Sequence, residues 1–301
     1  MNYISNTLTK TFKNKYHKDT LKIAVNMAWP AIIESFFIAF AGLIDSLMVS
    51  SLGSASVAAV GLTTQPKLLG LALFFALNVS ISALVARRRG EQRKDSANEI
   101  MLTAVLFIIV SAIILSICFV TLAGPIISLC GSTAETHDGA VAYFKIIMGG
   151  MIFNCIQMGV NAAQRGAGNT KITMRTNVTS NTINIILNYL FINGHFGFPA
   201  LGIHGAALAT VSGTVVGCIM SIISITKKDS FLSIPYIINK KINELEKREK
   251  YNTETFESTF LDLYKKVTRK KSERNFCYVM VIFYIGIIAL VIMIRTGQLN
   301  D

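Results

Sequence analysis

The chain has 301 residues, of which 52% are hydrophobic and 15% are charged, whereas soluble domains carry about 25% charged residues. Its 29 Lys and Arg and 17 Asp and Glu give a net charge of +12, and 21 of these 46 charges lie in residues 227–275. The rest of the chain has too few charges to solvate a globular surface, which argues against a soluble enzyme, a disordered chain or a disulfide scaffold. The composition predicts an all-α, multi-pass membrane protein.

In chain order, seven stretches are apolar over about 20 residues or more, the length that a helix needs to cross a bilayer. Six of them form a predicted six-helix lobe, with spans at 23–49, 54–86, 97–123, 138–162, 172–194 and 201–226. The second span is long enough to require a tilt or a bend, for which Pro66 and Gly70 offer a place. The predicted parts are a basic N-terminus (1–22), the six-helix lobe (23–226), a charged segment (227–275), an additional span (276–294) and a tail (295–301).

The distribution of Lys and Arg predicts how the protein lies in the membrane. If the N-terminus is cytoplasmic, 26 of the 29 Lys and Arg fall on the cytoplasmic side, in residues 1–22, 87–96, 163–175 and 227–275. The predicted external loops contain no Lys or Arg. Because positive charge favours the cytoplasmic side, we expect a cell-membrane protein with a cytoplasmic N-terminus and an external tail. This topology accounts for the positive charge without a nucleic-acid partner.

The charged segment 227–275 contains its own pattern. Phe256, Phe260, Leu263 and Val267 recur at helical spacing and predict a short amphipathic helix. The basic cluster that follows is either an ordinary flank of the last span or a site that attracts anionic lipid.

Polar side chains inside apolar spans are candidates for function, because they are costly in hydrocarbon. The first span holds Pro30, Glu34 and Asp45. The two acids are eleven residues apart, which places both carboxyls on one helix face. Asp45 is either an interfacial residue or a carrier of a proton or cation, and Glu34 is either a hydrogen-bonded core acid or part of the same lumen.

Two of the later spans carry rows of amides at helical spacing. The fifth has Asn177, Asn181, Asn184 and Asn188, and the fourth has Asn154, Gln157, Asn161 and Gln164. Such rows either hydrogen-bond neighbouring helices or line a wet cavity in which amide oxygens ligate a cation. Two polar rows together with a pair of acids favour a water-accessible lumen.

No pattern of an enzyme is present: the sequence has no nucleophile–base pair, HExxH, Walker loop or GxGxxG motif. The segment 165–169 predicts a tight cytoplasmic turn between the fourth and fifth spans, with glycines that reverse the backbone. Five cysteines without CxxC spacing predict free thiols and no metal site. We therefore expect neither catalytic residues nor a cofactor.

Five segments resemble those of the multidrug and toxin extrusion (MATE) transporters, in the family's order and spacing. They are LIDSLMVSSLGSASVAAVGL (43–62), ALVARRRGEQRKDSAN (83–98), QRGAGNTK (164–171), NIILNYLFI (184–192) and LGIHGAALATVSG (201–213). The resemblance covers residues 20–226. It implies the N-terminal six-helix lobe of a two-lobed transporter that exports organic cations or drugs in exchange for H⁺ or Na⁺.

The resemblance also assigns roles to single residues. Asp45 matches the first-helix aspartate that carries the proton or cation, and Pro30 matches the proline at which that helix bends. Asn184 and Thr210 match other residues of the coupling site, and Asn188 stands where many members have a second aspartate. The loss of that charge favours H⁺, with Na⁺ at Asp45 and Asn184 as the alternative. The candidates for lumen or substrate contact are Glu34, Tyr143, Asn154, Gln157, Asn161, Asn177 and Asn181.

The chain departs from the family after residue 226, where a second lobe would follow. The first hypothesis is therefore a half-transporter in the lipid bilayer, completed by a second copy or by a separate chain. The alternatives are a membrane-inserted remnant that transports nothing and a lipid-linked sugar flippase of the same superfamily. The family's turn motif and the surroundings of Asp45 argue against the flippase.

Overall fold

The structure is a computed structural model that describes residues 2–227 and 230–246. The predicted amphipathic helix at 256–267, the span 276–294 and the tail 295–301 lie outside the described residues. The helices are α1 (Asn2–Ser50), α2 (Ser54–Gly90), α3 (Lys94–Thr121), α4 (Ala123–Leu129), α5 (His137–Gly149), α6 (Met151–Gly166), α7 (Thr170–Asn193), η1 (His195–Gly197), α8 (Gly202–Thr226) and α9 (Ile234–Glu246). No strand occurs among these residues, which confirms the all-α prediction.

Each of the six predicted spans of the lobe falls on a helix or a helix pair. The span predicted as one helix at 138–162 is instead two, α5 and α6, bent by 45° at Gly150. By length and apolar composition, four helices of the described chain can cross a membrane, or five if the bent pair counts as one span. α7 does not qualify by this measure, because the amides, threonines and charges that it carries interrupt its apolar sequence.

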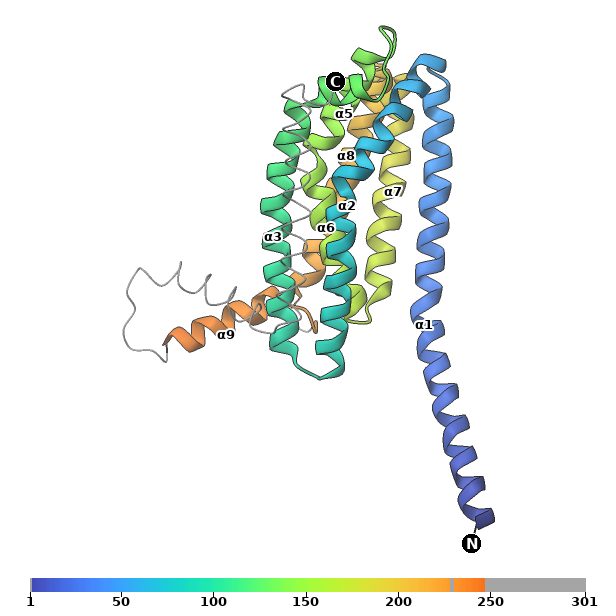
Figure 1. The fold of residues 1–301 in the computed structure, drawn as a ribbon, viewed down its shortest axis with the longest axis vertical. Helices are drawn as coiled ribbons and strands as arrows, with labels where there is room; N and C mark the ends of the chain where they lie inside the picture. Colours follow the sequence, from blue (N-terminus) through green and yellow to red (C-terminus); the bar gives the residue numbers. More distant parts are fainter. Residues whose placement is uncertain (1, 228–229, 247–301) are drawn as a thin grey trace, which may run out of the picture.

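The helices form a bundle in which α1 lies at one edge, beside α7 (Figure 1). α2, α3, α5 and α6 enclose the main apolar core, which includes the fully buried side chains of Phe74, Met101, Leu115, Phe144 and Met148. α7 packs most extensively against α8. The polar candidates of the sequence therefore lie at one side of the bundle, where α1, α6, α7 and α8 meet.

Glycines allow α7 and α8 to approach closely. A Cβ atom on Gly213 of α8 would lie 2.7 Å from the carbonyl oxygen of Ser180 and 3.0 Å from Cβ of Asn184, both on α7. The hydroxyl of Ser180 donates a hydrogen bond to the Gly213 carbonyl oxygen (2.7 Å). Small residues at such contacts let membrane helices pack backbone to backbone. They bring the amides of α7 within reach of α8.

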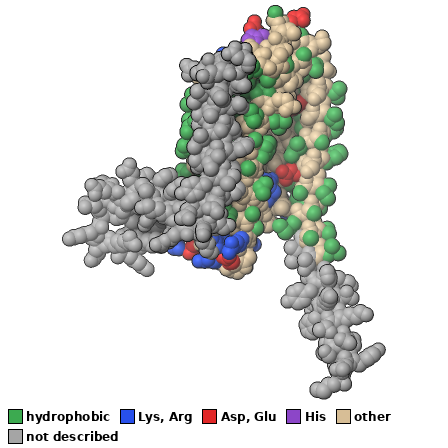
Figure 2. Space-filling model, viewed as in Figure 1, with side chains coloured by type: hydrophobic (Ala, Val, Ile, Leu, Met, Phe, Trp, Pro, Cys, Tyr) green, Lys and Arg blue, Asp and Glu red, His purple; other side chains and the backbone are tan. Residues whose placement is uncertain are grey.

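Hydrophobic side chains cover the sides of the bundle, and Lys and Arg gather at the end that carries the α2–α3 turn (Figure 2). In this turn Arg88 and Arg87 donate hydrogen bonds to Glu91 at 2.9 and 3.1 Å. These bonds lower the pKa of the Glu91 carboxyl to about 2. The exposed apolar sides are those expected of a protein surrounded by lipid. The cytoplasmic placement of the basic end stays a prediction.

The predicted turn between the fourth and fifth spans is confirmed. α6 ends at Gly166 and α7 begins at Thr170. Gly168 has φ +78°, a left-handed conformation that a glycine adopts without strain. The N–H of Asn169 donates to the carbonyl oxygen of Gln164 (2.8 Å) and closes the turn.

The described part of the charged segment docks on the bundle, a contact that the sequence did not reveal. Asp95, in the first turn of α3, accepts hydrogen bonds from Tyr236 (2.7 Å) and Lys240 (2.6 Å) of α9. The buried Asn98 accepts one from the backbone N–H of Ser233 (2.6 Å). Figure 1 shows α9 running sideways from this end of the bundle. Residues 230–240 are thus held against the ends of α3 and its neighbours.

Candidate functional site

The side chains of α1 that face the bundle recur at helical spacing. From Trp29 to Ser50, Pro30, Ala41 and Val49 are buried, and both acids, Glu34 and Asp45, are partly buried on the same side. The predicted common face of the two carboxyls is therefore confirmed. Each carboxyl points to a different part of α7, so the single row of asparagines predicted for α7 divides into an outer and an inner site.

The outer site surrounds Asp45. Nδ2 of Asn188 donates a hydrogen bond to Oδ1 of Asp45 (2.6 Å). The amide of Asn184 lies between Asp45 on α1 and Thr210 on α8, with a closest approach of 2.9 Å to Asp45 and 3.1 Å to Thr210 Oγ1. Thr210 also donates to the carbonyl oxygen of Ala206 (2.9 Å). The structure thus brings together all four residues assigned to the coupling site: Asp45, Asn184, Asn188 and Thr210.

The orientation of the Asn184 amide is fixed by its hydrogen-bonding partners. The network is satisfied when the Asn184 NH₂ group donates to Asp45 and its oxygen accepts from the backbone N–H of Thr210 (3.1 Å). In the opposite orientation the oxygen would face the Asp45 carboxylate, and two acceptors would meet. Asn184 therefore links α1 to α8.

Two further side chains interact electrostatically with Asp45: Lys67 of α2 and Tyr143 of α5. Tyr143, a predicted lumen residue, is buried beside Val49 of α1. Lys67 was missed in the sequence, although a single lysine inside a long apolar helix is itself a signal. Lys67 lies seven residues after Val60, so these two residues share one face of α2. Val60 packs against the cluster that contains Tyr143.

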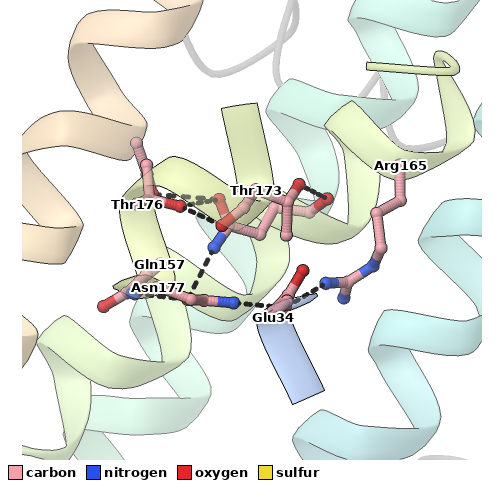
Figure 3. Close-up of polar contacts among 8 residues, drawn as sticks. Glu34, Gln157, Arg165, Thr173, Thr176 and Asn177 are labelled. Atoms are coloured by element: carbon pink, nitrogen blue, oxygen red, sulfur yellow. Dashed lines mark hydrogen bonds and ion pairs between the residues drawn. The ribbon is translucent and has the colours of Figure 1, made fainter. Parts of the chain in front are cut away.

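The inner site surrounds Glu34 (Figure 3). Nδ2 of Asn177 donates to Oε1 of Glu34 (2.5 Å), and Nη1 of Arg165 lies 3.7 Å from the same oxygen. Oδ1 of Asn177 accepts from Gln157 (2.8 Å) and Asn161 (3.2 Å) of α6. Predicted lumen residues from three helices therefore contact one another directly.

Hydroxyl groups extend the inner site to α8. Oδ1 of Asn161 accepts from Thr176 of α7 (3.2 Å) and Ser221 of α8 (3.1 Å). Nε2 of Gln164 donates to Ser224 (3.1 Å), one turn further along α8. These hydroxyl residues and Arg165 were missed, because serine and threonine are common in membrane helices and Arg165 was assigned to the turn. The inner amides serve as hydrogen-bonding contacts between helices, one of the two predicted alternatives.

Two predicted lumen residues, Asn154 and Asn181, are in neither site. Both are partly buried, and among the described residues neither side chain has a hydrogen-bonding partner. The described residues hold no group of three or more His, Cys, Asp or Glu that could bind a metal ion. Cys118, Cys130, Cys155 and Cys218 are free thiols, as predicted, and Cys277 lies outside the described residues.

Comparison with known proteins identifies the family. The family model for MatE matches residues 30–190, more than half of the chain. The chain belongs to the MatE family. It is 28% identical over 203 residues to the uncharacterized transporter YisQ of Bacillus subtilis, a match that covers 67% of this chain and 45% of YisQ. A probable multidrug resistance protein, NorM of Thermotoga maritima, is 27% identical over 225 residues, with 73% and 48% covered.

Solved MATE structures share the fold. An outward-facing multidrug resistance MATE family transporter of the MOP superfamily superposes with a TM-score of 0.66 at 26% identity, covering 71% of this chain and 47% of that one. These matches confirm the resemblance inferred from the five motifs, and they indicate a transporter rather than an enzyme. The chain spans about half the length of the curated relatives it matches.

Proposed function

We propose that this MatE chain is one lobe of a proton-coupled antiporter that exports small organic cations across the cell membrane. The observation that carries the proposal is the setting of Asp45. Its closest partners are the neutral amides of Asn188 and Asn184, and no described cation lies within ion-pairing distance of it. A carboxyl held in this way inside an apolar bundle can gain and lose a proton without breaking a direct ion pair.

Proton binding at Asp45 has a defined structural consequence. A protonated Asp45 carboxyl can donate to the Asn184 oxygen, in which case the Asn184 NH₂ group turns toward Thr210 and the hydrogen bonds that join α1, α7 and α8 are exchanged. It also removes the negative charge that attracts Lys67. An organic cation and a proton thus compete for the same carboxylate, which is the requirement for exchange of one against the other.

Na⁺ is the alternative coupling ion. The oxygens of Asp45 and Thr210 lie on either side of the Asn184 amide, and among the described residues the buried Oδ1 of Asn188 has no hydrogen-bonding partner. Hard cations favour such oxygen ligands. The single carboxylate and the nearby Lys67 weigh against Na⁺, because a cation site is weakened by a neighbouring positive charge.

A transport pathway between two lobes requires a partner for this lobe. We propose that the partner is a second copy of the chain or a separate polypeptide. α1 lies at the edge of the bundle with Phe36, Leu43 and Leu47 exposed, so a partner or lipid has to cover this side. Cross-linking in native membranes distinguishes a homodimer from a complex with another chain.

Replacing Asp45 by Asn tests the proposal. The amide cannot take up a proton, so we expect Asp45→Asn to reduce resistance to a cationic dye to the level of an empty vector in a host that lacks its own efflux pumps. Asp138→Asn is the matched control, because Asp138 is exposed at the start of α5. Membrane abundance of both variants is measured in parallel.

The outcome separates the hypotheses. Loss of resistance for Asp45→Asn alone, at equal abundance, supports proton coupling at this residue. Unchanged resistance in that variant rejects Asp45 as the coupling residue. If the wild-type chain gives no resistance, either alone or with a co-expressed second lobe, the chain is a non-transporting remnant.

A further inference from the structure

The inner half of α1 has little apolar contact with the rest of the bundle. Between Trp29 and Ala41, Pro30 is the only residue with a buried side chain, and the large side chains of Ile32, Phe36 and Phe40 are exposed. Apolar packing stabilises roughly in proportion to the area removed from contact with the surroundings. The position of this half therefore depends on its polar contacts.

Glu34 makes those contacts. It receives a hydrogen bond from Asn177 of α7 (2.5 Å) and pairs with Arg165 of α6 (3.7 Å), so three helices are joined at one carboxyl. Its side chain is 12% exposed and that of Arg165 is 36% exposed. Figure 3 shows Asn177 and Arg165 approaching Glu34 from different directions.

The donor to Glu34 is held in place by other residues. Oδ1 of Asn177 accepts two hydrogen bonds, from Gln157 and from Asn161. An amide oxygen engaged in this way leaves the NH₂ group only one direction, which is toward Glu34. Asn161 is in turn held by Thr176 and Ser221. The Asn177 NH₂ group is thus oriented toward Glu34 by residues of α6, α7 and α8.

We propose that Glu34 is a positioning residue that fastens the inner half of α1 to α6 and α7, independently of the Asp45 site. The two carboxyls are eleven residues apart, about 16 Å along the helix, and within the described part of the chain they share no hydrogen-bonding partner. Glu34 lies one turn after Pro30, so a bend of α1 at that proline moves Glu34 away from Asn177. The fastening therefore opposes such a bend.

Hydrogen exchange of the full chain in lipid nanodiscs tests this proposal without any assay of transport. The variants are Glu34→Gln, Arg165→Gln and the double variant, with Arg165→Lys as the conservative change. The sole tryptophan, Trp29, lies five residues before Glu34 and is 39% exposed. Quenching of its fluorescence by acrylamide gives an independent measure of the same region.

We expect Glu34→Gln to raise exchange in residues 24–40 by about tenfold, the size expected for loss of a charged hydrogen bond. Arg165→Gln should raise it by about two- to fivefold, the size expected for loss of a partly exposed ion pair. Exchange in residues 42–50 should change by less than about twofold. The double variant should match the larger single effect, because both changes remove one interaction. Arg165→Lys should retain most of the protection, and Trp29 quenching should follow the same order.

The matched controls are Glu99→Gln on α3 and Arg175→Gln on α7, whose side chains have no hydrogen bond or ion pair with the described residues. The proposal is overturned if the single variants leave residues 24–40 protected, or if exchange rises equally along the whole of α1. It is also overturned if Arg165→Lys behaves like Arg165→Gln, or if the double variant is additive. Unchanged exchange in 97–121 of α3 verifies that each variant is folded.

Discussion

The two acidic residues of α1 share a helix face but have different partners. Glu34 is bonded to Asn177 and pairs with Arg165 at 3.7 Å. Asp45 is bonded to neutral amides, and its nearest described cation, Lys67, lies beyond ion-pairing distance. A carboxylate in an ion pair loses that pair when it is neutralised, whereas one among amides can exchange a proton or a cation without breaking an ion pair. The difference in partners is consistent with the separate roles proposed for Glu34 and Asp45.

The surroundings of the two sites differ in rigidity as well. At the outer site, Gly213 of α8 lies against the backbone of Ser180 and against Asn184. At the inner site, Gly217, one turn further along α8, lies against the end of the Gln157 side chain. A backbone cannot move away without shifting a whole helix, whereas a glutamine can change rotamer. The approach of α8 to α7 at Gly213 is thus limited by backbone, whereas its approach to α6 at Gly217 is limited by a side chain.

The largest expected effect comes from replacing Gly213 or Gly217 by alanine, which adds a methyl group at a close helix contact. Gly213→Ala places a methyl group 2.7 Å from a carbonyl oxygen, so we expect the free energy of unfolding to fall by about 1–3 kcal/mol. Gly217→Ala should cost less, about 1 kcal/mol, because Gln157 can turn aside at the expense of its hydrogen bond to Asn177. Gly61→Ala is the control, since nothing lies within 4 Å of its added Cβ. Denaturant unfolding in detergent measures all three, and an equal loss for both alanines would contradict the comparison.

The sequence predicted the outer site better than the inner one. The eleven-residue spacing of Glu34 and Asp45 and the row of asparagines identified the facing sides of α1 and α7, because periodicity reports which residues share a face. Periodicity does not report which residue of a third helix reaches that face. Lys67 and Arg165 could not be matched to a particular acid for this reason, since a long side chain can reach across a bundle.

The bend at Gly150 and the docking of α9 were both missed. The adjacent Gly149 and Gly150 are a local signal for the break between α5 and α6, which the apolar sequence around them obscured. The segment 230–240 is held by Asp95 and Asn98, which lie more than 130 residues earlier in the chain. Contacts at that separation depend on how the helices assemble, and no local pattern encodes them. The helices of the described lobe were nevertheless predicted, with the fourth span as one helix instead of two.

A second variant tests the difference between the two sites by adding a negative charge to the outer site. Asn188→Asp places a second carboxyl beside Asp45, at the position of a 2.6 Å contact. Two carboxylates favour a bound cation. We therefore expect the melting temperature of this variant to be about 4 °C higher in Na⁺ than in choline at equal ionic strength. A shift of that size corresponds to a binding contribution of about 1 kcal/mol to the free energy of unfolding. The wild type should show no such difference. Asn181→Asp is the control on the same helix, and an equal response there would reject a site specific to Asp45.

The smallest effect is expected where α9 docks, outside the membrane-spanning part. The hydrogen bonds from Lys240 and Tyr236 lower the pKa of Asp95 below its ordinary value, and the bond to Asp95 raises the pKa of Tyr236. A carboxyl with a lowered pKa contributes stability above its unfolded value, near 3.9, and loses it as the pH falls through the lower folded value. The contribution of Tyr236 to stability is lost as the pH rises through its folded-state pKa, which lies above about 10.

The docking contact should therefore be constant between about pH 5 and pH 8. Because Asp95 and Lys240 are both more than 40% exposed, the pair is worth only about 0.2–1 kcal/mol. We expect Asp95→Asn to raise hydrogen exchange in residues 231–240 by about two- to fivefold at every pH in this range. Protection of α1 should be unaffected, since Asp95 contacts neither acid of that helix. A change in the exchange of α1 would show that the docked segment and the Glu34 site are coupled, and that the two ends of the lobe do not act separately.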